Sequence, residues 1–177
     1  TRLSEEVDFG AWLKIQTPES VSLKKAEIES NPYWAQVGTQ IDGTAGSHQL
    51  GRAVACSHDG TRIIAGGFAF NSSQGKVIVY DWNGSGWTMV GNVLTGTATS
   101  APSFGHSVAI SGDGNIIAVT APYEHVSGDA DKGTVRVYYL VGATWTILPD
   151  SGSLTNASLT DVFVGATAND YLGYGGV

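Results

Sequence analysis

Apolar residues alternate with polar or small residues in short runs along most of this 177-residue chain, and turn-forming residues separate the runs. Alternation with a period of two residues is typical of β-strands that bury one face. Two groups of four strands are predicted in this way. They are Arg52–Ser57, Ile63–Phe68, Val77–Trp82 and Trp87–Leu94, and then His106–Ser111, Ile116–Ala121, Val135–Leu140 and Trp145–Leu148. We therefore expect an all-β fold.

The second group of strands repeats the first. Leu50-Gly51 returns 54 residues later as Phe104-Gly105, and Gly75–Tyr80 returns 58 residues later as Gly133–Tyr138. The offset grows because four residues are inserted in the loop Tyr123–Lys132. Internal self-similarity at this spacing indicates a repeat architecture in which each unit packs against the next.

Turn residues support this division into repeats. The first two strands of each group are joined by Ser57–Gly60 and by Ser111–Gly114, and both segments end in Asp-Gly. Such turns need a residue with a positive φ angle, which glycine adopts without steric cost. Both segments are therefore predicted to form β-hairpins.

A period of 53–58 residues with four short strands is the size of one β-propeller blade. We therefore predict an incomplete β-propeller of four-stranded antiparallel blades over residues 33–177. Its full blades span about 47–96 and 101–150, and a partial blade spans 161–177. Closed propellers have about four to eight blades, so further sequence or a neighbouring molecule is expected to cover the exposed blade faces.

Residues at both ends of this region are less regular. Trp34–Gly43 matches the outer strand that begins at Trp87, so it is expected to belong to a preceding or final blade. Pro149–Gly152 interrupts the outer strand of the second blade. Leu172-Gly173 resembles Phe104-Gly105 again, at an offset of 68 residues.

Residues 1–32 differ from the repeats and form a separate strand-rich segment. Alternating residues predict strands at Ala11–Ile15 and Val21–Ile28, with Pro18 in the turn between them. A helix over Ser20–Glu29 is also compatible with the spacing of its apolar residues.

Composition excludes several partners. The net charge is −7, from 9 basic and 16 acidic residues, which argues against nucleic acid or an anionic membrane surface as the main partner. No apolar run approaches the roughly 18 residues of a membrane-spanning helix, so no membrane insertion is expected. The single cysteine, Cys56, cannot form an internal disulfide, and its apolar strand predicts that it is buried.

Candidate ligand residues lie in the inserted loop. Its polar cluster contains Glu124, Asp129 and Asp131, which would bind a cation only with further ligands from elsewhere; the alternative is a solvated loop. Tyr123 and His125 of the same loop are candidates for binding a ligand, because binding sites concentrate on the loops of rigid scaffolds.

Tryptophans divide into two classes. Trp34, Trp87 and Trp145 recur at the repeat spacing, which favours packing between blades. Trp82 does not recur, because its counterpart is Leu140, so it is the better candidate for a surface contact with a glycan.

Catalytic and cofactor motifs are not evident in the sequence. It contains neither a G-x-S-x-G elbow before a helix nor a G-x-x-x-x-G-K-[ST] phosphate loop, so we expect no enzyme activity and no cofactor. Three N-x-S/T sequons lie in predicted loops and are candidates for glycosylation, at Asn71, Asn83 and Asn156. They are consistent with an extracellular location.

The repeated pattern Phe/Leu-Gly-x-x-Val-Ala-x-Ser-x-Asp-Gly, followed by Gly-x-Val-x-Val-Tyr, resembles the FG-GAP repeat of integrin-alpha-like β-propellers. The resemblance implies a binding role in adhesion on extracellular surfaces. Some members bind calcium in an Asp-rich hairpin loop. Here each hairpin carries one carboxylate, Asp59 or Asp113, so calcium binding is not expected at these loops. Residues 10–28 are also similar to a strand pair of discoidin-like, galactose-binding-like jelly rolls.

These observations lead to one functional hypothesis and one alternative. The hypothesis is a non-enzymatic surface module, acting in adhesion or in an external assembly of a cell surface or virion. Its partners would be proteins or neighbouring subunits, with glycans as a further class. The alternative is an accessory propeller domain of a larger extracellular enzyme or carbohydrate-binding protein.

Overall fold

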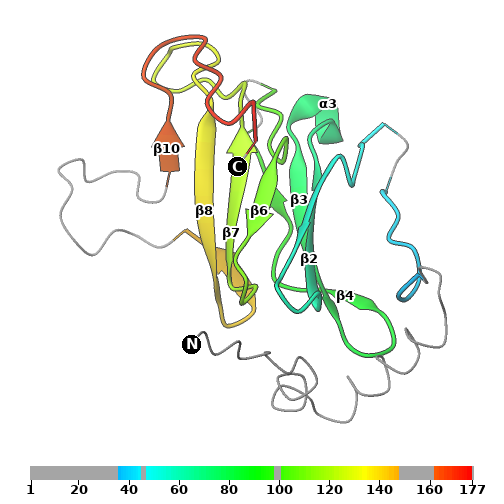
Figure 1. Cartoon of the computed structure of the whole chain (residues 1–177). Helices are drawn as coiled ribbons and strands as arrows, with labels where there is room; N and C mark the ends of the chain where they lie inside the picture. The colour runs from blue at the N-terminus through cyan, green and yellow to red at the C-terminus, as the bar shows by residue number, and fades with distance from the viewer. Residues whose placement is uncertain (1–35, 45–46, 98–100, 148–161, 177) are drawn as a thin grey trace, which may run out of the picture. The chain divides into compact units, whose positions relative to one another are not determined.

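A computed structural model of the chain has an all-β fold with two antiparallel sheets (Figure 1). It describes residues 36–44, 47–97, 101–147 and 162–176. All of these residues except the first two belong to one compact unit, Gly38–Val177. The predictions for residues 1–32, for Trp34, for Pro149–Gly152 and for Asn156 lie outside the described residues.

The first sheet contains the first predicted group of strands, in the spatial order β1-β2-β3-β4. Its strands are β1 (Ala53–Cys56), β2 (Arg62–Gly67), β3 (Lys76–Trp82), β4 (Trp87–Met89) and β5 (Leu94–Thr95). Both β4 and β5 pair with β3, β4 at its end and β5 at its start. The predicted strand Trp87–Leu94 is thus interrupted, at a point where Gly91 has a φ of 74° and lies against Trp145.

The second sheet repeats this arrangement, in the spatial order β10-β8-β7-β6. Its strands are β6 (Val108–Ile110), β7 (Ile116–Ala121), β8 (Thr134–Val141), β9 (Thr144–Thr146) and β10 (Val162–Val164). β9 pairs with the end of β8 and β10 with its start, as β4 and β5 do with β3. Residues 162–164 therefore belong to the second sheet, although the sequence assigned them to a third repeat.

Short turns connect the strands as the Asp-Gly sequences predict. The N–H of Gly60 donates to the carbonyl of Ser57 at 3.0 Å, and the N–H of Gly114 donates to the carbonyl of Ser111 at 2.9 Å. Both glycines have positive φ angles, of 69° and 75°. The loop between β2 and β3 contains one short helical turn, α3 (Phe70–Ser73). Among the described residues, no helix has the length and apolarity needed to cross a membrane.

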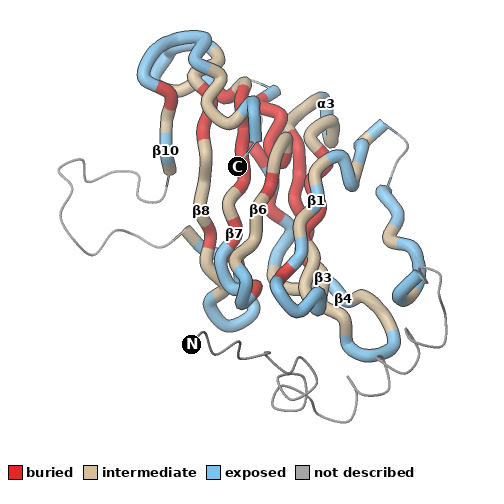
Figure 2. The backbone as a smooth tube through the Cα atoms, in the orientation of Figure 1, coloured by how far each residue is buried: buried red, intermediate tan, exposed pale blue. Residues whose placement is uncertain are grey.

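The hydrophobic core lies between the two sheets. The first sheet contributes Ile64, Val77, Val79 and Leu94, and the second contributes Phe104, Val108, Ile117, Val119, Ala121, Tyr138 and Trp145. Figure 2 shows that buried positions gather along the strands, whereas the turns are mostly exposed. Polar contacts also join the two sheets, and two of them come from side chains. The Trp145 indole N–H donates to the Val90 carbonyl at 3.0 Å, and the Arg62 guanidinium donates to the Gly114 carbonyl at 2.8 Å.

The prediction that Cys56 is buried is wrong, because its side chain is exposed. Burial alternates along β1, and Ala53 and Ala55 pack against the core. Val54 and Cys56 therefore lie on the opposite face, which is largely uncovered at this strand. The apolar run Ala53–Cys56 predicts a strand, but it does not predict which face of the strand other segments bury.

Candidate functional site

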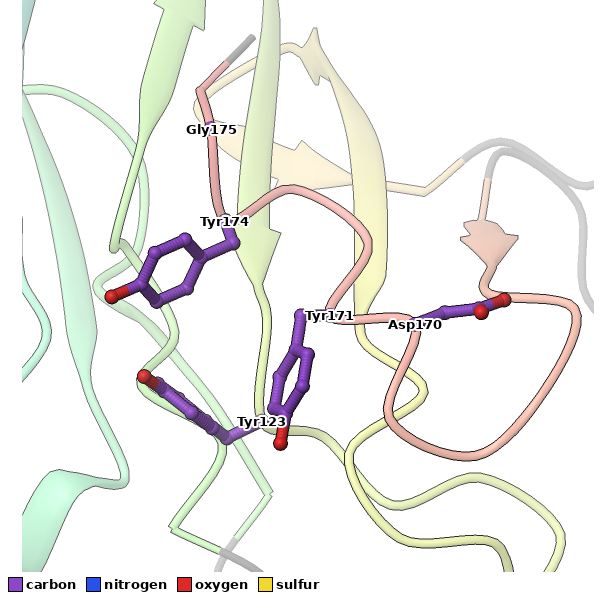
Figure 3. A pocket seen from close by; sticks show the side chains of 5 residues that line it. All are labelled: Tyr123, Asp170, Tyr171, Tyr174 and Gly175. Atoms are coloured by element: carbon purple, nitrogen blue, oxygen red, sulfur yellow. The ribbon is translucent and has the colours of Figure 1, made fainter.

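The main candidate site is a pocket of about 610 Å³ at one end of the second sheet (Figure 3). It is formed by the β7–β8 loop and by the segment that follows β10. Its lining residues are Tyr123, Asp170, Tyr171, Tyr174 and Gly175. We call it the tyrosine pocket.

The two segments that form the tyrosine pocket are joined through their backbones. Three N–H groups of residues 169–172 donate to carbonyls of residues 130–132 at 3.0–3.1 Å. The pairs are Asn169 to Ala130, Tyr171 to Asp131 and Leu172 to Lys132. The inserted residues of the second repeat therefore support the segment that carries most of the pocket's side chains.

The three tyrosine rings lie edge to face. The Tyr123 ring centroid is 5.7 Å from that of Tyr171 and 6.0 Å from that of Tyr174, with interplanar angles of 73° and 88°. The rings contact one another through their edges, and Tyr174 is 55% exposed. Partial burial raises the pKa of Tyr123, and a hydrogen bond with Tyr174 raises it further. The Tyr123 hydroxyl is therefore protonated at neutral pH.

Asp170 adds a negative charge at the rim of the pocket. Its carboxylate accepts hydrogen bonds from the backbone N–H and the hydroxyl of Thr167, each at 2.8 Å. These hydrogen bonds, led by the one from the backbone, lower the pKa of Asp170. Figure 3 shows that the carboxylate points away from the three tyrosine rings.

A second hollow of about 410 Å³ adjoins the first and shares Tyr174 and Gly175 with it. It is also lined by Arg52 and His106. The Tyr174 ring stacks on the His106 ring, with centroids 5.2 Å apart. Burial lowers the pKa of His106 and the charge of Arg52 lowers it further, so the imidazole is neutral at physiological pH. Its Nδ1 atom is buried and has no hydrogen-bond partner in the described structure.

The candidate cation ligands are not brought together. Glu124 is buried, and its carboxylate accepts hydrogen bonds at 2.5 Å from Arg136 and from Thr134. Asp129 pairs with Lys132 at 2.6 Å, and Asp131 lies 3.3 Å from His125. Within the described ranges, no group of three or more His, Cys, Asp and Glu side chains could hold a metal ion. Each of these acidic groups has a basic partner instead.

Trp82 lies apart from the tyrosine pocket. It faces Trp87 across the β3–β4 hairpin, with ring centroids 5.4 Å apart, and a side chain at Gly38 would overlap its ring. This hairpin lies at the end of β3, whereas the pocket loops follow the end of β7 and precede β8. Trp82 as a glycan contact stays a prediction that the geometry does not link to the pocket.

Of the predicted ligand residues, Tyr123 lines the tyrosine pocket and His125 does not. Asp170, Tyr171 and Tyr174 were not among the predicted ligand residues, because they fall in the segment predicted as a partial blade. One signal could have found Tyr174. It follows Leu-Gly where His106 follows Phe-Gly and Arg52 follows Leu-Gly, so the repeat places all three at one strand end.

Two of the candidate glycosylation sites are described. Asn71 and Asn83 are both exposed. The side-chain oxygen of Asn83 accepts hydrogen bonds from the backbone N–H groups of Ser85 and Gly86, each at 2.9 Å. Their exposure is compatible with modification, which stays a prediction.

No protein-family model and no curated protein matches the sequence. The likeness to FG-GAP repeats therefore stays a prediction from the internal repeat of the sequence.

Proposed function

We propose that the two sheets are consecutive blades of an FG-GAP-like β-propeller. The chain would act as a non-catalytic surface module in adhesion or in an external assembly of a cell or virion. Hydrogen bonds at equivalent places support the blade assignment. Gly51 donates to Gly66 at 3.0 Å, and Gly105 donates to Thr120 at 2.9 Å. Each bond joins the residues just before a sheet's first strand to the second strand of the same sheet.

The junctions between successive units are also equivalent. Side chains at Gly75 and Gly133 would overlap the backbones of Phe104 and Leu172, respectively. Leu172 thus packs against the second sheet in the way that Phe104 packs against the first. In a propeller, the next blade would begin at this point. This repetition is the arrangement that a propeller requires, because each blade packs on the next.

The observation that carries the binding role is the tyrosine pocket. Residues shared by the two repeats serve turns and packing, whereas the pocket is formed by the inserted loop and by the segment after β10. Exposed aromatic and polar side chains on loops of a rigid scaffold are typical of binding sites. We therefore assign partner recognition to this end of the second sheet.

A cell-surface binding assay tests this function. Fluorescently labelled protein is titrated onto a panel of intact cells, with Tyr174→Ala as the pocket variant and Met89→Ala as the control. Tyr174 and Met89 are similarly exposed, 55% and 54%, but Met89 lies on β4 of the first sheet. We expect saturable binding that Tyr174→Ala weakens at least tenfold and Met89→Ala leaves within twofold. Absence of saturable binding, or equal binding by both variants, would contradict the proposal.

A further inference from the structure

The tyrosine pocket and the hollow beside it share Tyr174 and Gly175 in their linings, and we call the two together the groove. The aromatic side of this groove extends beyond the tyrosines. The His106 ring lies between those of Phe68 and Tyr174, with centroid distances of 5.6 and 5.2 Å. Tyr174 is still 55% exposed, so much of its surface is open to a ligand.

The cationic end of the groove is Arg52. Other basic side chains of the described structure are committed to acidic partners: Arg62 to Asp81, Lys132 to Asp129 and Arg136 to Glu124. Lys76 is buried over the ring of Phe70. Among the described residues, Arg52 is thus the one exposed basic side chain without an ion pair.

The unpaired guanidinium of Arg52 shares its hollow with the half-exposed Tyr174, and this pair defines the chemistry of a ligand. It must carry an anionic group for Arg52 and a face of C–H groups that can pack on tyrosine. Tyr123 adds a phenol hydroxyl, a group that can donate a hydrogen bond to a ligand hydroxyl. Asp170, the acidic residue that lines the groove, directs its carboxylate away from the rings. A sugar that bears a carboxylate meets all of these requirements.

We propose that this groove binds a carboxylate-bearing sugar, with its carboxylate on Arg52 and its ring against Tyr174 and Tyr123. This inference rests on the proposed binding function, of which it names the ligand class. Uronic and sialic acids share this chemistry. The protein's net charge of −7 disfavours non-specific binding of such anions, so their recognition needs a local cation of this kind.

Isothermal titration calorimetry with defined oligosaccharides tests the proposal. The probes are an oligogalacturonate, its methyl ester, which lacks the charge, and a sialylated trisaccharide. We expect one of the two acidic probes to bind. Arg52→Gln should weaken that binding at least tenfold, and Arg52→Lys should restore part of it. Tyr174→Ala should weaken it at least tenfold as well, while Met89→Ala leaves it within twofold.

Three results would overturn the proposal. They are no binding of either acidic probe, equal binding of the oligogalacturonate and its methyl ester, or full binding by Arg52→Gln. A glutamate-rich peptide that binds with the same dependence on Arg52, while no sugar binds, would assign the groove to acidic peptides instead. If surface binding in the cell assay persists without sugar binding, the ligand class fails but the binding function stands. Thermal unfolding of each variant shows that the fold is intact.

Discussion

The two sheets carry the same apolar pattern, but residues at equivalent positions in them can differ sharply in burial. Val54 and Val108 occupy equivalent positions in β1 and β6, yet Val54 is 67% exposed and Val108 is 6% exposed. Leu94 and Phe163, at equivalent positions in β5 and β10, are 8% and 60% exposed. The comparison teaches that the same apolar position is buried where it lies between the two sheets and exposed where no second sheet covers it.

The outer faces remain available for contact. Val54 and Phe163 expose apolar surface on the far sides of the first and second sheet, respectively. Exposed apolar positions that have buried equivalents in the same molecule favour the proposal that further blades cover these faces.

The largest loss of stability is expected for a substitution at Gly75, where the second repeat packs closely against the first sheet. Gly75 and Gly51 have similar φ angles, 81° and 88°, but only a side chain at Gly75 would overlap another segment, the backbone of Phe104. Gly51→Ala should cost about 1–2 kcal/mol from backbone strain alone. Gly75→Ala should cost clearly more, to the point that the fold is lost. Equal losses in urea denaturation would contradict this close approach.

The next largest loss of stability is expected at Trp145, at the edge of the interface between the two sheets. Trp145 is 3% exposed, and its indole N–H donates to the Val90 carbonyl. Trp145→Ala should reduce the free energy of unfolding by about 3–5 kcal/mol, as expected for a buried aromatic residue. Trp145→Phe keeps most of the packing and should cost less. If the two substitutions cost the same, the hydrogen bond rather than the burial would account for the effect.

Arg62 should have an intermediate effect, because it links the two sheets. Its guanidinium pairs with Asp81 at 2.5 and 2.7 Å and also reaches the Gly114 carbonyl. Arg62→Met should cost about 1–2 kcal/mol, since the ion pair is only partly buried. Ile116 occupies the equivalent position in the second sheet and is 38% exposed, so Ile116→Met is the control. A similar loss for both in denaturant titrations would contradict a linking role for Arg62.

The smallest effect is the pH dependence contributed by the hairpin carboxylate Asp59. Hydrogen bonds, first from the Ser57 hydroxyl and then from the Thr61 N–H, lower the pKa of Asp59 from 3.8 to about 2. Because the folded pKa lies below the unfolded one, the stabilisation is present above about pH 4 and is lost as the pH falls toward 2. The side chain is exposed, so solvent screening keeps this contribution below about 1 kcal/mol.

Asp59→Asn measures this contribution. Urea denaturation at pH 5 and at pH 2.5 should show a smaller stability difference for Asp59→Asn than for the parent chain. An unchanged difference would assign the acid sensitivity to other carboxylates.

The strands of both sheets could be predicted because each short alternating run is bounded by a turn residue, as at Gly60 and Gly114. The position of β10 could not. It pairs with the start of β8 although a long stretch of sequence separates it from β9, and no local pattern predicts that both strands pair with β8. Burial of Cys56 was mispredicted for a related reason, since coverage of a face depends on other segments.

The tyrosine pocket could be predicted only in part. Tyr123 lies in the inserted loop, whose variability between the repeats marks it as a candidate. Tyr171 and Tyr174 join it only because residues 169–172 pair with residues 130–132 through their backbones. Such a pairing of two irregular segments has no periodic signal. Glu124 is the opposite case, a residue that was predicted as a cation ligand and is not available as one. Its carboxylate accepts hydrogen bonds from Arg136 and Thr134.

The most direct test of the account compares Val108→Ala with Val54→Ala by urea denaturation. The two substitutions are chemically identical and lie at equivalent places in the two sheets, at 6% and 67% exposure. Val108→Ala should cost about 1–3 kcal/mol, because it removes buried methyl groups between the sheets, whereas Val54→Ala should cost less than about 0.5 kcal/mol. Equal losses, or a larger loss for Val54→Ala, would contradict a core formed by the facing sides of the two repeats.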